Sequence, residues 1–342
     1  MLKFGKMFKI SVCIPVYNVA SYIETCAKSL MEQTLDEIEY IFVDDCSPDN
    51  SIELLKKTLS HYPRRRQSVK IIRNDENMGP ALSRKRAAEF ATGKFVYFPD
   101  SDDWIEPDML EIMYNKGIEE NADIVKCTYV NEYSNRSAIS KELFKFGNEE
   151  WRKRILTSDD VYIGLTTSLI RSDLNKIVLN DFPEKRLYCF EDYLHMVKLH
   201  FTAEITTWVD KAFYHRNTIN PYSVSKISKR QIESKLYVAQ AIDDFFARRS
   251  DKKQYQNDIL RFKANAKLVL LSSHNAWNPN RWKELWPETN NPELIIPYGL
   301  STRLYKKVAM NVNIGHYSIA YLMMLSSNII LSVARRIRSL LR

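Results

Sequence analysis

Asp100, Asp102 and Asp103 stand within four positions, directly after an apolar run, and their carboxylates could bind a metal ion. The apolar residues 95–98 are rich in β-forming types and predict a buried strand, whose end would deliver the acids into a cleft. Side chains alternate along an extended segment, so we expect Asp100 and Asp102 on one side and Ser101 on the other. Two carboxylates this close repel unless a cation neutralises them. Carboxylate oxygens are good ligands for Mg²⁺ or Mn²⁺, and such an ion could in turn bind a diphosphate. The alternative is a solvated acidic turn that caps the next helix.

Alternating strand and helix patterns over the first hundred residues must position this acid cluster. Buried strands are expected at residues 9–16, 40–43, 70–72 and 95–98, separated by helices at 20–33, 52–59 and 80–91. Such alternation predicts an α/β fold with a doubly wound, mainly parallel sheet and right-handed crossovers. Ligands of these sheets bind outside the carboxyl ends of the strands. Four polar side chains fall at or just after those ends: Asn18, Asp45, Asn77 and Asp100. We therefore expect them to line one cleft.

The pattern weakens beyond a fifth strand expected at 123–126. The later expectations are a loop or flap over 131–160, a helix from 191 toward 201, helices at 232–242 and 259–270, and an irregular connection over 275–299. This predicts a catalytic domain over 1–225, followed by a C-terminal helical extension. The extension would consist of a helical subdomain over 226–300 and a basic tail over 301–342.

Composition limits the class of protein. A chain of 342 residues that is 45% hydrophobic can bury a full core. Its five cysteines are scattered and lack CxxC spacing, which favours reduced thiols in a cytoplasmic protein over disulfides or zinc. Lysines at positions 3, 6 and 9 interrupt what would be the apolar core of a signal peptide, so we expect none. Outside its last 42 residues the chain is close to neutral, whereas a nucleic-acid-binding protein more often shows a basic stripe with interleaved aromatic residues, so we expect no nucleic-acid partner.

Residues 301–342 carry seven of the 50 Lys and Arg residues and none of the 42 acids, so the rest of the chain is close to neutral. Within this tail, residues 317–334 are uncharged, at the lower length limit for a membrane-spanning helix, but Ser and Asn residues interrupt them. One apolar face is expected from Ile330, Val333, Ala334, Ile337 and Leu341, with arginines on another. This pattern predicts a helix lying in the plane of an anionic membrane. The alternatives are a helix packed on the protein's own core or in a homo-oligomer, and a true span.

Five motifs occur in an order that is specific when they are taken together. They are residues 11–18 (SVCIPVYN), 43–49 (VDDCSPD), 77–80 (NMGP) with Arg84, 100–103 (DSDD) and 191–192 (ED). Together they resemble family 2 glycosyltransferases of GT-A fold, in particular bacterial enzymes that glycosylate capsule, lipopolysaccharide or teichoic-acid chains. The resemblance covers about residues 8–225. It implies a nucleotide-sugar half over about 8–130 and an acceptor half over about 131–225. Family members usually have Gly where this chain has Cys46.

The resemblance also implies roles for the residues in these motifs. The residues implied to bind the nucleotide-sugar are Pro15, Tyr17, Asn18, Asp45, Asn77, Arg84, Asp100 and Ser101. Pro15, Tyr17 and Asp45 would contact a uracil ring, Asn77 and Arg84 the base and diphosphate, and Asp100 the ribose. Asp102 would bind the metal, and His215 could be a further metal ligand. Asp192 would be the general base. For most of these residues the plain alternative is a strand end, a helix cap or a solvated helix residue.

The resulting hypothesis is an inverting, Mn²⁺- or Mg²⁺-dependent glycosyltransferase that acts at the inner face of the cell membrane. Its donor would be a UDP-sugar, and its acceptor a surface-polysaccharide or glycolipid chain. A sugar nucleotidyltransferase is one rival, but it would need a Gly-rich basic loop where residues 18–21 read NVAS. A non-catalytic nucleotide- or sugar-binding module is the other. Such a module would tolerate loss of Asp102 or Asp192, and both acids are present.

Overall fold

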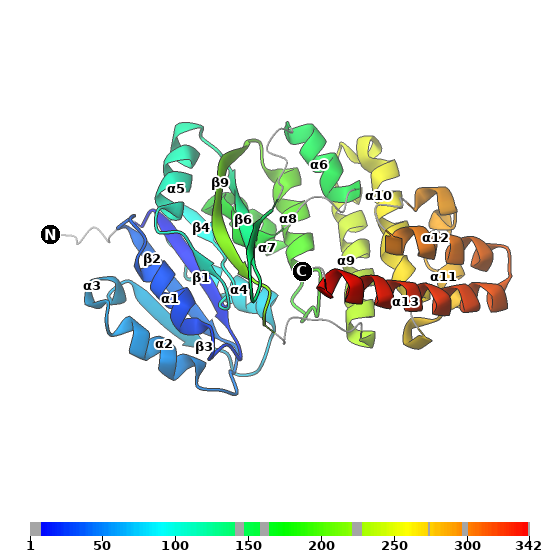
Figure 1. Ribbon diagram of the computed structural model, residues 1–342. Helices are drawn as coiled ribbons and strands as arrows, with labels where there is room; N and C mark the ends of the chain where they lie inside the picture. Colours follow the sequence, from blue (N-terminus) through cyan, green and yellow to red (C-terminus); the bar gives the residue numbers. More distant parts are fainter. Residues whose placement is uncertain are drawn as a thin grey trace. The chain divides into compact units, whose positions relative to one another are not determined.

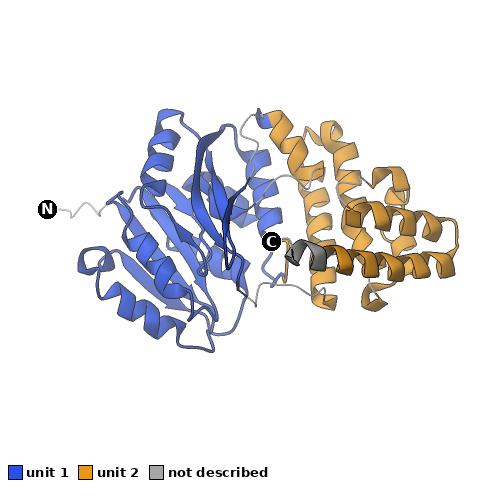
Figure 2. Ribbon diagram, in the orientation of Figure 1, with its two compact units in different colours: residues 1–148, 162–187, 191–225 blue, residues 149–161, 188–190, 226–342 orange. Residues whose placement is uncertain are grey.

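The structure is a computed structural model that describes residues 8–140, 147–157, 164–220, 228–272, 274–295 and 300–340 (Figure 1). The chain divides into two compact units (Figure 2). Unit 1 holds residues 1–148, 162–187 and 191–225, and unit 2 holds residues 149–161, 188–190 and 226–342. The main boundary follows residue 225. Two short segments from inside the expected catalytic domain nevertheless belong to unit 2. The expected tail is part of unit 2 as well.

The first four strands of unit 1 are parallel. They are β1 (Ile10–Val16), β2 (Ile38–Asp44), β3 (Val69–Arg73) and β4 (Phe95–Tyr97), in the spatial order β3-β2-β1-β4. All residues of β1, β2 and β4 are buried, as expected for parallel strands covered on both faces. Val16 pairs with Asp44, and Asp44 pairs with Arg73, so the loops after these strands begin at one edge of the sheet. The predicted doubly wound arrangement is confirmed.

Three connecting helices cover this half of the sheet. They are α1 (Ile23–Met31), α2 (Ser51–Leu59) and α4 (Pro80–Glu89), with a short turn, α3 (Pro63–Arg66), after α2. Right-handed crossovers place α1 and α2 on one face, while the return connection from β3 to β4 places α4 on the other. Gly79, with φ 84°, and Pro80 in the first turn begin α4. Proline suits this position because its fixed φ is already helical and it needs no backbone donor there.

The second half of the sheet mixes directions. Its strands are β5 (Trp104–Ile105), β6 (Ile124–Glu132), β7 (Ser137–Ile139), β8 (Ser168–Arg171) and β9 (Thr206–Asn217). β8 is antiparallel to both β4 and β6, whereas β9 runs parallel to β6 and antiparallel to β5. Its helices are α5 (Met109–Glu119), α7 (Ser172–Asn180) and α8 (Glu191–Thr202), and a short 3₁₀ turn spans Leu165–Thr167. The prediction of a loop over 131–160 is wrong for its described residues, which include β7 and α6 (Asn148–Thr157).

Unit 2 is helical. Besides α6 it contains α9 (Lys229–Ala247), α10 (Lys252–Lys267), α11 (Pro279–Glu284), α12 (Leu300–Asn313) and α13 (Tyr317–Leu340). The helix expected to run to residue 270 ends at Lys267 and continues as a short turn, Leu268–Leu271. The irregular connection expected over 275–299 contains α11 and the short turns His274–Ala276, Pro287–Thr289 and Pro292–Leu294. Trp282 from this connection packs in one core with Val308 and Val312 of α12 and Met324 of α13. The C-terminal region is therefore built into the core of unit 2.

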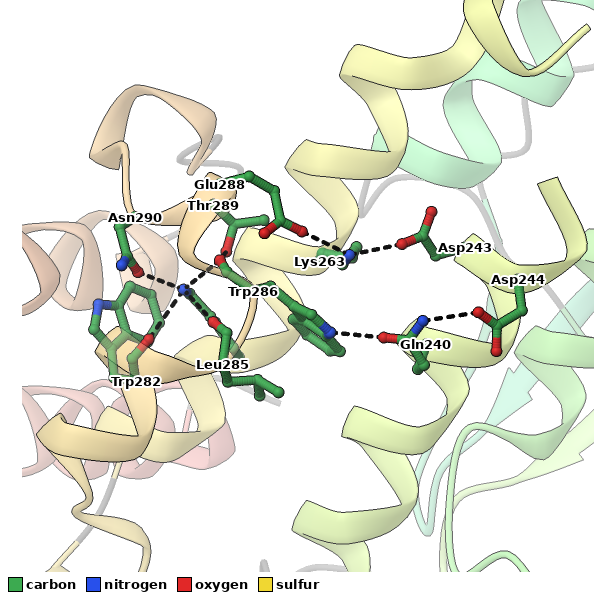
Figure 3. Close-up of polar contacts among 11 residues, drawn as sticks. Gln240, Asp243, Asp244, Lys263, Trp282, Leu285, Trp286, Glu288, Thr289 and Asn290 are labelled. Carbon is green, nitrogen blue, oxygen red and sulfur yellow. Dashed lines mark hydrogen bonds and ion pairs between the residues drawn. The ribbon is translucent and has the colours of Figure 1, made fainter. Parts of the chain in front are cut away.

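Two lysines of α10 fix this connection to the helices. Lys267 is fully buried, and its ammonium donates to the carbonyl oxygens of Trp282 and Leu285 at 3.1 and 3.0 Å and to Asn290 Oδ1 at 2.6 Å. Lys263 bridges Asp243 and Glu288 at 2.6 and 2.9 Å (Figure 3). Several oxygen acceptors around each buried ammonium offset the cost of removing its charge from water. The indole of Trp286 meanwhile donates to Gln240 on α9.

Candidate active site

The acid cluster lies in a tight turn between β4 and β5. The Asp103 amide donates to the Asp100 carbonyl at 3.3 Å, so the chain reverses here and is not extended. The expected extended backbone is therefore wrong here, although the carboxylates of Asp100 and Asp102 do lie close together, and Ser101 is buried within the turn. The turn nevertheless gathers the acids, because carboxylate oxygens of Asp100, Asp102 and Asp103 lie within 4.8 Å of one another.

Two of these acids are tied to the chain around the end of β9. Asp103 accepts hydrogen bonds from the Tyr214 hydroxyl and, at 2.7 Å, from the Asn217 amide. Burial, together with the charges of Asp100 and Asp102, raises the pKa of Asp103 to about 8. Asp102 accepts a hydrogen bond from the Asn220 amide group at 2.8 Å. Asp103 therefore anchors the turn, while Asp100 and Asp102 remain partly exposed.

Arg84 connects the acid cluster to the start of α8. This α4 residue is 4% exposed, and its two terminal nitrogens donate to different carboxylates. Nη2 reaches Asp100 Oδ1 at 2.5 Å, and Nη1 reaches Asp192 Oδ1 at 2.6 Å. Burial by itself would lower the pKa of Arg84. The negative charges of Asp192, Asp100 and Glu191 have the larger effect and raise this pKa above its ordinary value. Residues 84, 100 and 192, distant in sequence, thus meet in one charge network.

Asp192 and Glu191 form the first turn of α8. Desolvation raises the pKa of Asp192 above its ordinary value, and the Arg84 guanidinium offsets part of that rise. Desolvation and the neighbouring Asp192 charge raise the pKa of Glu191 to about 7. A carboxylate whose pKa is raised, held in place by hydrogen bonding, has the properties of a general base. The role of Asp192 as base stays a prediction.

Asp45 holds the loop between β3 and α4. It is 2% exposed, and it accepts from Asn74 Nδ2 at 2.7 Å and from the amides of Met78 and Gly79 at 2.8 Å. Its carboxylate has room for one more donor, because two oxygens offer about four acceptor sites. Asp45 is thus a loop anchor here, and its contact with uracil stays a prediction. The next residue, Cys46, has φ 59°, a conformation that glycine adopts more easily.

Two predicted donor-site residues carry buried polar atoms without a partner. Asn77 Oδ1 and Arg84 Nε are inaccessible to solvent and make no hydrogen bond to the described part of the protein. Buried polar atoms are nearly always satisfied in folded proteins, so each such atom needs an explanation. One is an acceptor and the other a donor, and both belong to residues for which a nucleotide contact is predicted.

The remaining residues predicted to bind the nucleotide lie at the end of β1. Pro15 is buried in the strand, and Tyr17, just past its end, is 47% exposed. Asn18 takes φ 55°, which turns the chain toward α1. An exposed aromatic ring at this edge is available to stack on a flat ligand. The structure places all three at the expected edge of the sheet and does not test their contacts.

His215 lies on β9, opposite Trp104 of β5. Its imidazole stacks on the indole with ring centroids 5.2 Å apart, Nδ1 contacts Glu132 at 2.8 Å, and Nε2 contacts Glu106 at 2.9 Å. Among the described residues, the group with metal-ligand spacing contains the three aspartates and not His215. Both ring nitrogens are engaged by carboxylates here, and a metal role for His215 stays a prediction.

Several supporting residues were not predicted from the sequence. They are Asn74, which contacts Asp45; Glu106 and Glu132, which contact His215; and Tyr214 and Asn220, which contact the turn of residues 100–103, called the acid turn below. None stands in a motif with a spacing of its own. The one available signal was the segment 214–220, which is rich in hydrogen-bonding side chains.

The chain resembles known proteins in sequence and in fold. The sequence pattern of the family Glycosyl transferase family 2 matches residues 11–178. The putative glycosyltransferase EpsH of Bacillus subtilis strain 168 is 28% identical over 294 residues, which cover 84% of this chain and 82% of that protein.

Two solved structures show the same architecture. S. aureus TarS 1–349 in complex with UDP-GlcNAc matches with a TM-score of 0.66 and 22% identity, over 94% of this chain and 92% of that one. The mannosyltransferase PcManGT from Pyrobaculum calidifontis, in complex with GDP-Man and Mn²⁺, matches with a TM-score of 0.50 and 16% identity, over 91% and 88% of the two chains. At these identities the likeness concerns the fold.

Proposed function

Since the chain is a family 2 glycosyltransferase of GT-A fold, we propose that it is an inverting enzyme that transfers a sugar from a UDP-sugar and depends on a divalent cation. The solved TarS structure contains UDP-GlcNAc, which supports a UDP-linked donor. The acceptor that we propose is a surface-polysaccharide or glycolipid chain, in keeping with the bacterial glycosyltransferases that this chain resembles.

The Arg84 network carries this proposal. A glycosyltransferase must hold the donor by its diphosphate and place a base nearby, so that the acceptor hydroxyl lies between the base and the anomeric carbon. Arg84 contacts both the acid turn, through Asp100, and the proposed base, Asp192. A nucleotide could satisfy the buried, unpartnered Asn77 Oδ1 and Arg84 Nε only once these side chains become accessible, so the proposal rests on the contacts of Arg84 and not on these two atoms.

The donor set of the acid turn fits a hard divalent cation. Asp100 and Asp102 would hold the ion, because their partly exposed carboxylates retain acceptor capacity, whereas the hydrogen bonds of Asp103 to Tyr214 and Asn217 hold that acid in the turn. When bound, the cation would neutralise charge on the diphosphate leaving group. The Mn²⁺ in the PcManGT complex supports this assignment.

Asp192 would then act on the acceptor. Its carboxylate removes the proton of the acceptor hydroxyl as the oxygen forms a bond to the anomeric carbon of the sugar. The bond between that carbon and the diphosphate oxygen breaks, and the electron pair leaves with the diphosphate. Attack from the face opposite the leaving group inverts the anomeric configuration. Arg84 holds the base in position throughout, because its second hydrogen bond anchors it to Asp100.

The first test concerns metal-dependent donor binding. Asp102→Asn should weaken UDP binding in Mn²⁺ at least about tenfold, the effect expected when a metal site is disturbed, and should have little effect in EDTA. Isothermal titration calorimetry measures both conditions. Asp210→Asn, which changes an exposed acid on β9, is the matched control and should bind like the parent. Equal affinity of Asp102→Asn and parent protein in Mn²⁺ would refute the proposed metal site.

A further inference from the structure

The helix α13 has two apolar sides, and only one of them is packed. On the packed side, Ala320 and Met324 are fully buried in the core of unit 2 with Val308, Ala309 and Val312 of α12. Five large apolar side chains lie on the other side at helical spacing, and each is about half exposed or more: Ile319, Leu322, Ile329, Ile330 and Val333. We call these five residues the α13 outer face. It includes Ile330 and Val333 of the face expected from the sequence, and it begins a full three turns earlier.

An unpacked apolar face of this kind requires a partner. A helix that is apolar all round is normally buried, and contiguous exposed apolar residues mark an interaction site or a membrane contact. The exposed fractions of Leu322 and Ile329 are both 65%, so burial of this face would remove substantial apolar surface from water. The structure thus contains one side that holds α13 on unit 2 and another that is available for binding.

The packed side of α13 argues against a membrane-spanning helix. Residues Tyr317–Ala334 are long and apolar enough to cross a membrane by length and composition, with a mean hydropathy of 1.5, and 22% of them are buried. A spanning helix would have to withdraw Ala320 and Met324 from the core of unit 2, exposing the α12 residues packed against them. Contact through the outer face alone leaves that core intact.

The positive charge near the α13 outer face indicates which partner it binds. Residues 301–342, which include α13, carry seven Lys and Arg residues and no acid. Three of these, Arg335, Arg336 and Arg338, follow the outer face directly in the sequence. A second copy of the chain would bring an equal positive charge to the contact, and like charges oppose association. Anionic lipid headgroups supply the opposite charge, next to acyl chains that take up apolar side chains.

We propose that the α13 outer face binds the surface of an anionic membrane, with α13 lying in the membrane plane and its core-facing side still packed on unit 2. Leu322, Ile329 and their neighbours enter the boundary between headgroups and acyl chains, and the arginines contact the headgroups. Both contributions are needed, because a single apolar or electrostatic signal gives only weak and reversible binding.

The test uses point substitutions in the full chain. Deletion of α12 and α13 would remove core residues of unit 2 and would confound loss of binding with unfolding. Leu322→Gln combined with Ile329→Gln alters the outer face alone, and Ile177→Gln, at a 60% exposed isoleucine on α7, is its control. Arg335→Gln, Arg336→Gln and Arg338→Gln together remove charge. Their control is Lys56→Gln, Lys57→Gln and Arg64→Gln, at exposed bases of unit 1.

Co-sedimentation with vesicles measures binding. The parent should bind vesicles of phosphatidylcholine with 30% phosphatidylglycerol, bind pure phosphatidylcholine far less, and dissociate as salt rises. The triple arginine variant should partition on the order of a hundredfold less at low salt. The double outer-face variant should lose about tenfold or more. Both control variants should bind like the parent.

Three outcomes would overturn the proposal. The first is equal binding by the parent and the outer-face variant. The second is binding that resists salt and carbonate, which would indicate a span. The third is a parent that is dimeric by sedimentation equilibrium, does not bind vesicles, and becomes monomeric through the outer-face substitutions. Thermal unfolding of every variant checks that unit 2 remains folded. Because donor binding by unit 1 is measured separately, failure here leaves the proposed function standing.

Discussion

Arg84 holds two carboxylates that the sequence places 92 residues apart, at positions 100 and 192. Its planar fork can reach both at once, which a lysine ammonium does less well. Because the guanidinium lowers the pKa of Asp192, Arg84→Gln should move the acid limb of the kcat–pH profile to higher pH. Arg84→Lys should move it less. An acid limb that stays in place in Arg84→Gln would contradict the proposed link between Arg84 and the base.

The two acids at the start of α8 can be separated by experiment. Asp192→Asn should retain donor affinity and lower turnover by about 10²–10⁴-fold, the usual contribution of a general base. Glu191→Gln should have the smaller effect, because of these two acids it is Asp192 that accepts a hydrogen bond from Arg84. Single-turnover transfer assays with saturating donor measure both variants. If Glu191→Gln were the more damaged enzyme, the base would have to be reassigned to Glu191.

At the scale of elements, Asp45 controls the loop over residues 74–79. Three donors converge on its carboxylate, and an asparagine side chain offers only one acceptor oxygen to them. Asp45→Asn should therefore cost about 2–3 kcal/mol of unfolding free energy, since hydrogen bonds to charged groups are the stronger ones. The same change should expose the loop to proteases. Urea unfolding and limited proteolysis measure the two effects, and Asp75→Asn, an exposed acid in this loop, should show neither.

The elements that could be predicted are those with strong periodicity or motif spacing. Strands β1 to β4 and helices α1, α2 and α4 follow directly from continuous apolar runs and helical spacing, and parallel pairing then gathers Asp45, Asn77 and Asp100 at one edge. The sequence predicts an extended strand end over residues 100–103, where the structure has a turn, because the residues DSDD are compatible with both conformations. The helix α6 was missed, because its first turns are charged and only Trp151, Ile155 and Leu156 are buried.

The partners of these residues could not be predicted. His215 meets Glu106 and Glu132 through pairing of β9 with β5 and β6, which brings together residues up to 109 positions apart. One sequence contains no signal for such long-range pairs. The supporting contacts of Asp103 with Tyr214 and Asn217 arise in the same way. Motif residues were therefore predictable, whereas the residues that orient them were not.

At the scale of the whole molecule, His195 should make the protein sensitive to acid. Burial, with the charges of Arg84 and Lys198, lowers the pKa of this histidine to about 3, and its ring contacts Asn175 Oδ1 at 3.0 Å. In the unfolded chain a histidine takes up its proton near pH 6.5. Between these two values the unfolded state binds more protons, so stability falls as the pH drops from 6.5 toward 3. This one group contributes up to about 1.4 kcal/mol per pH unit.

Chemical unfolding between pH 4 and pH 7 measures this dependence. His195→Gln retains a hydrogen-bonding side chain but does not titrate, so its stability should change less steeply with pH. His61→Gln, at an exposed histidine, should leave the slope of the parent unchanged. A parent and a His195→Gln variant with the same slope would show that other groups cause the acid sensitivity.

The path of the chain between the two units has a consequence for synthesis on the ribosome. Residues 149–161 emerge before unit 1 is complete, yet they belong to unit 2, whose other helices begin only after residue 228. The apolar side chains of α6, Trp151, Ile155 and Leu156, therefore leave the exit tunnel long before α10 is made. Exposed apolar segments of this kind are prone to aggregation. Nascent chains stalled near residue 230 should accordingly recruit chaperones, and release them once unit 2 is complete.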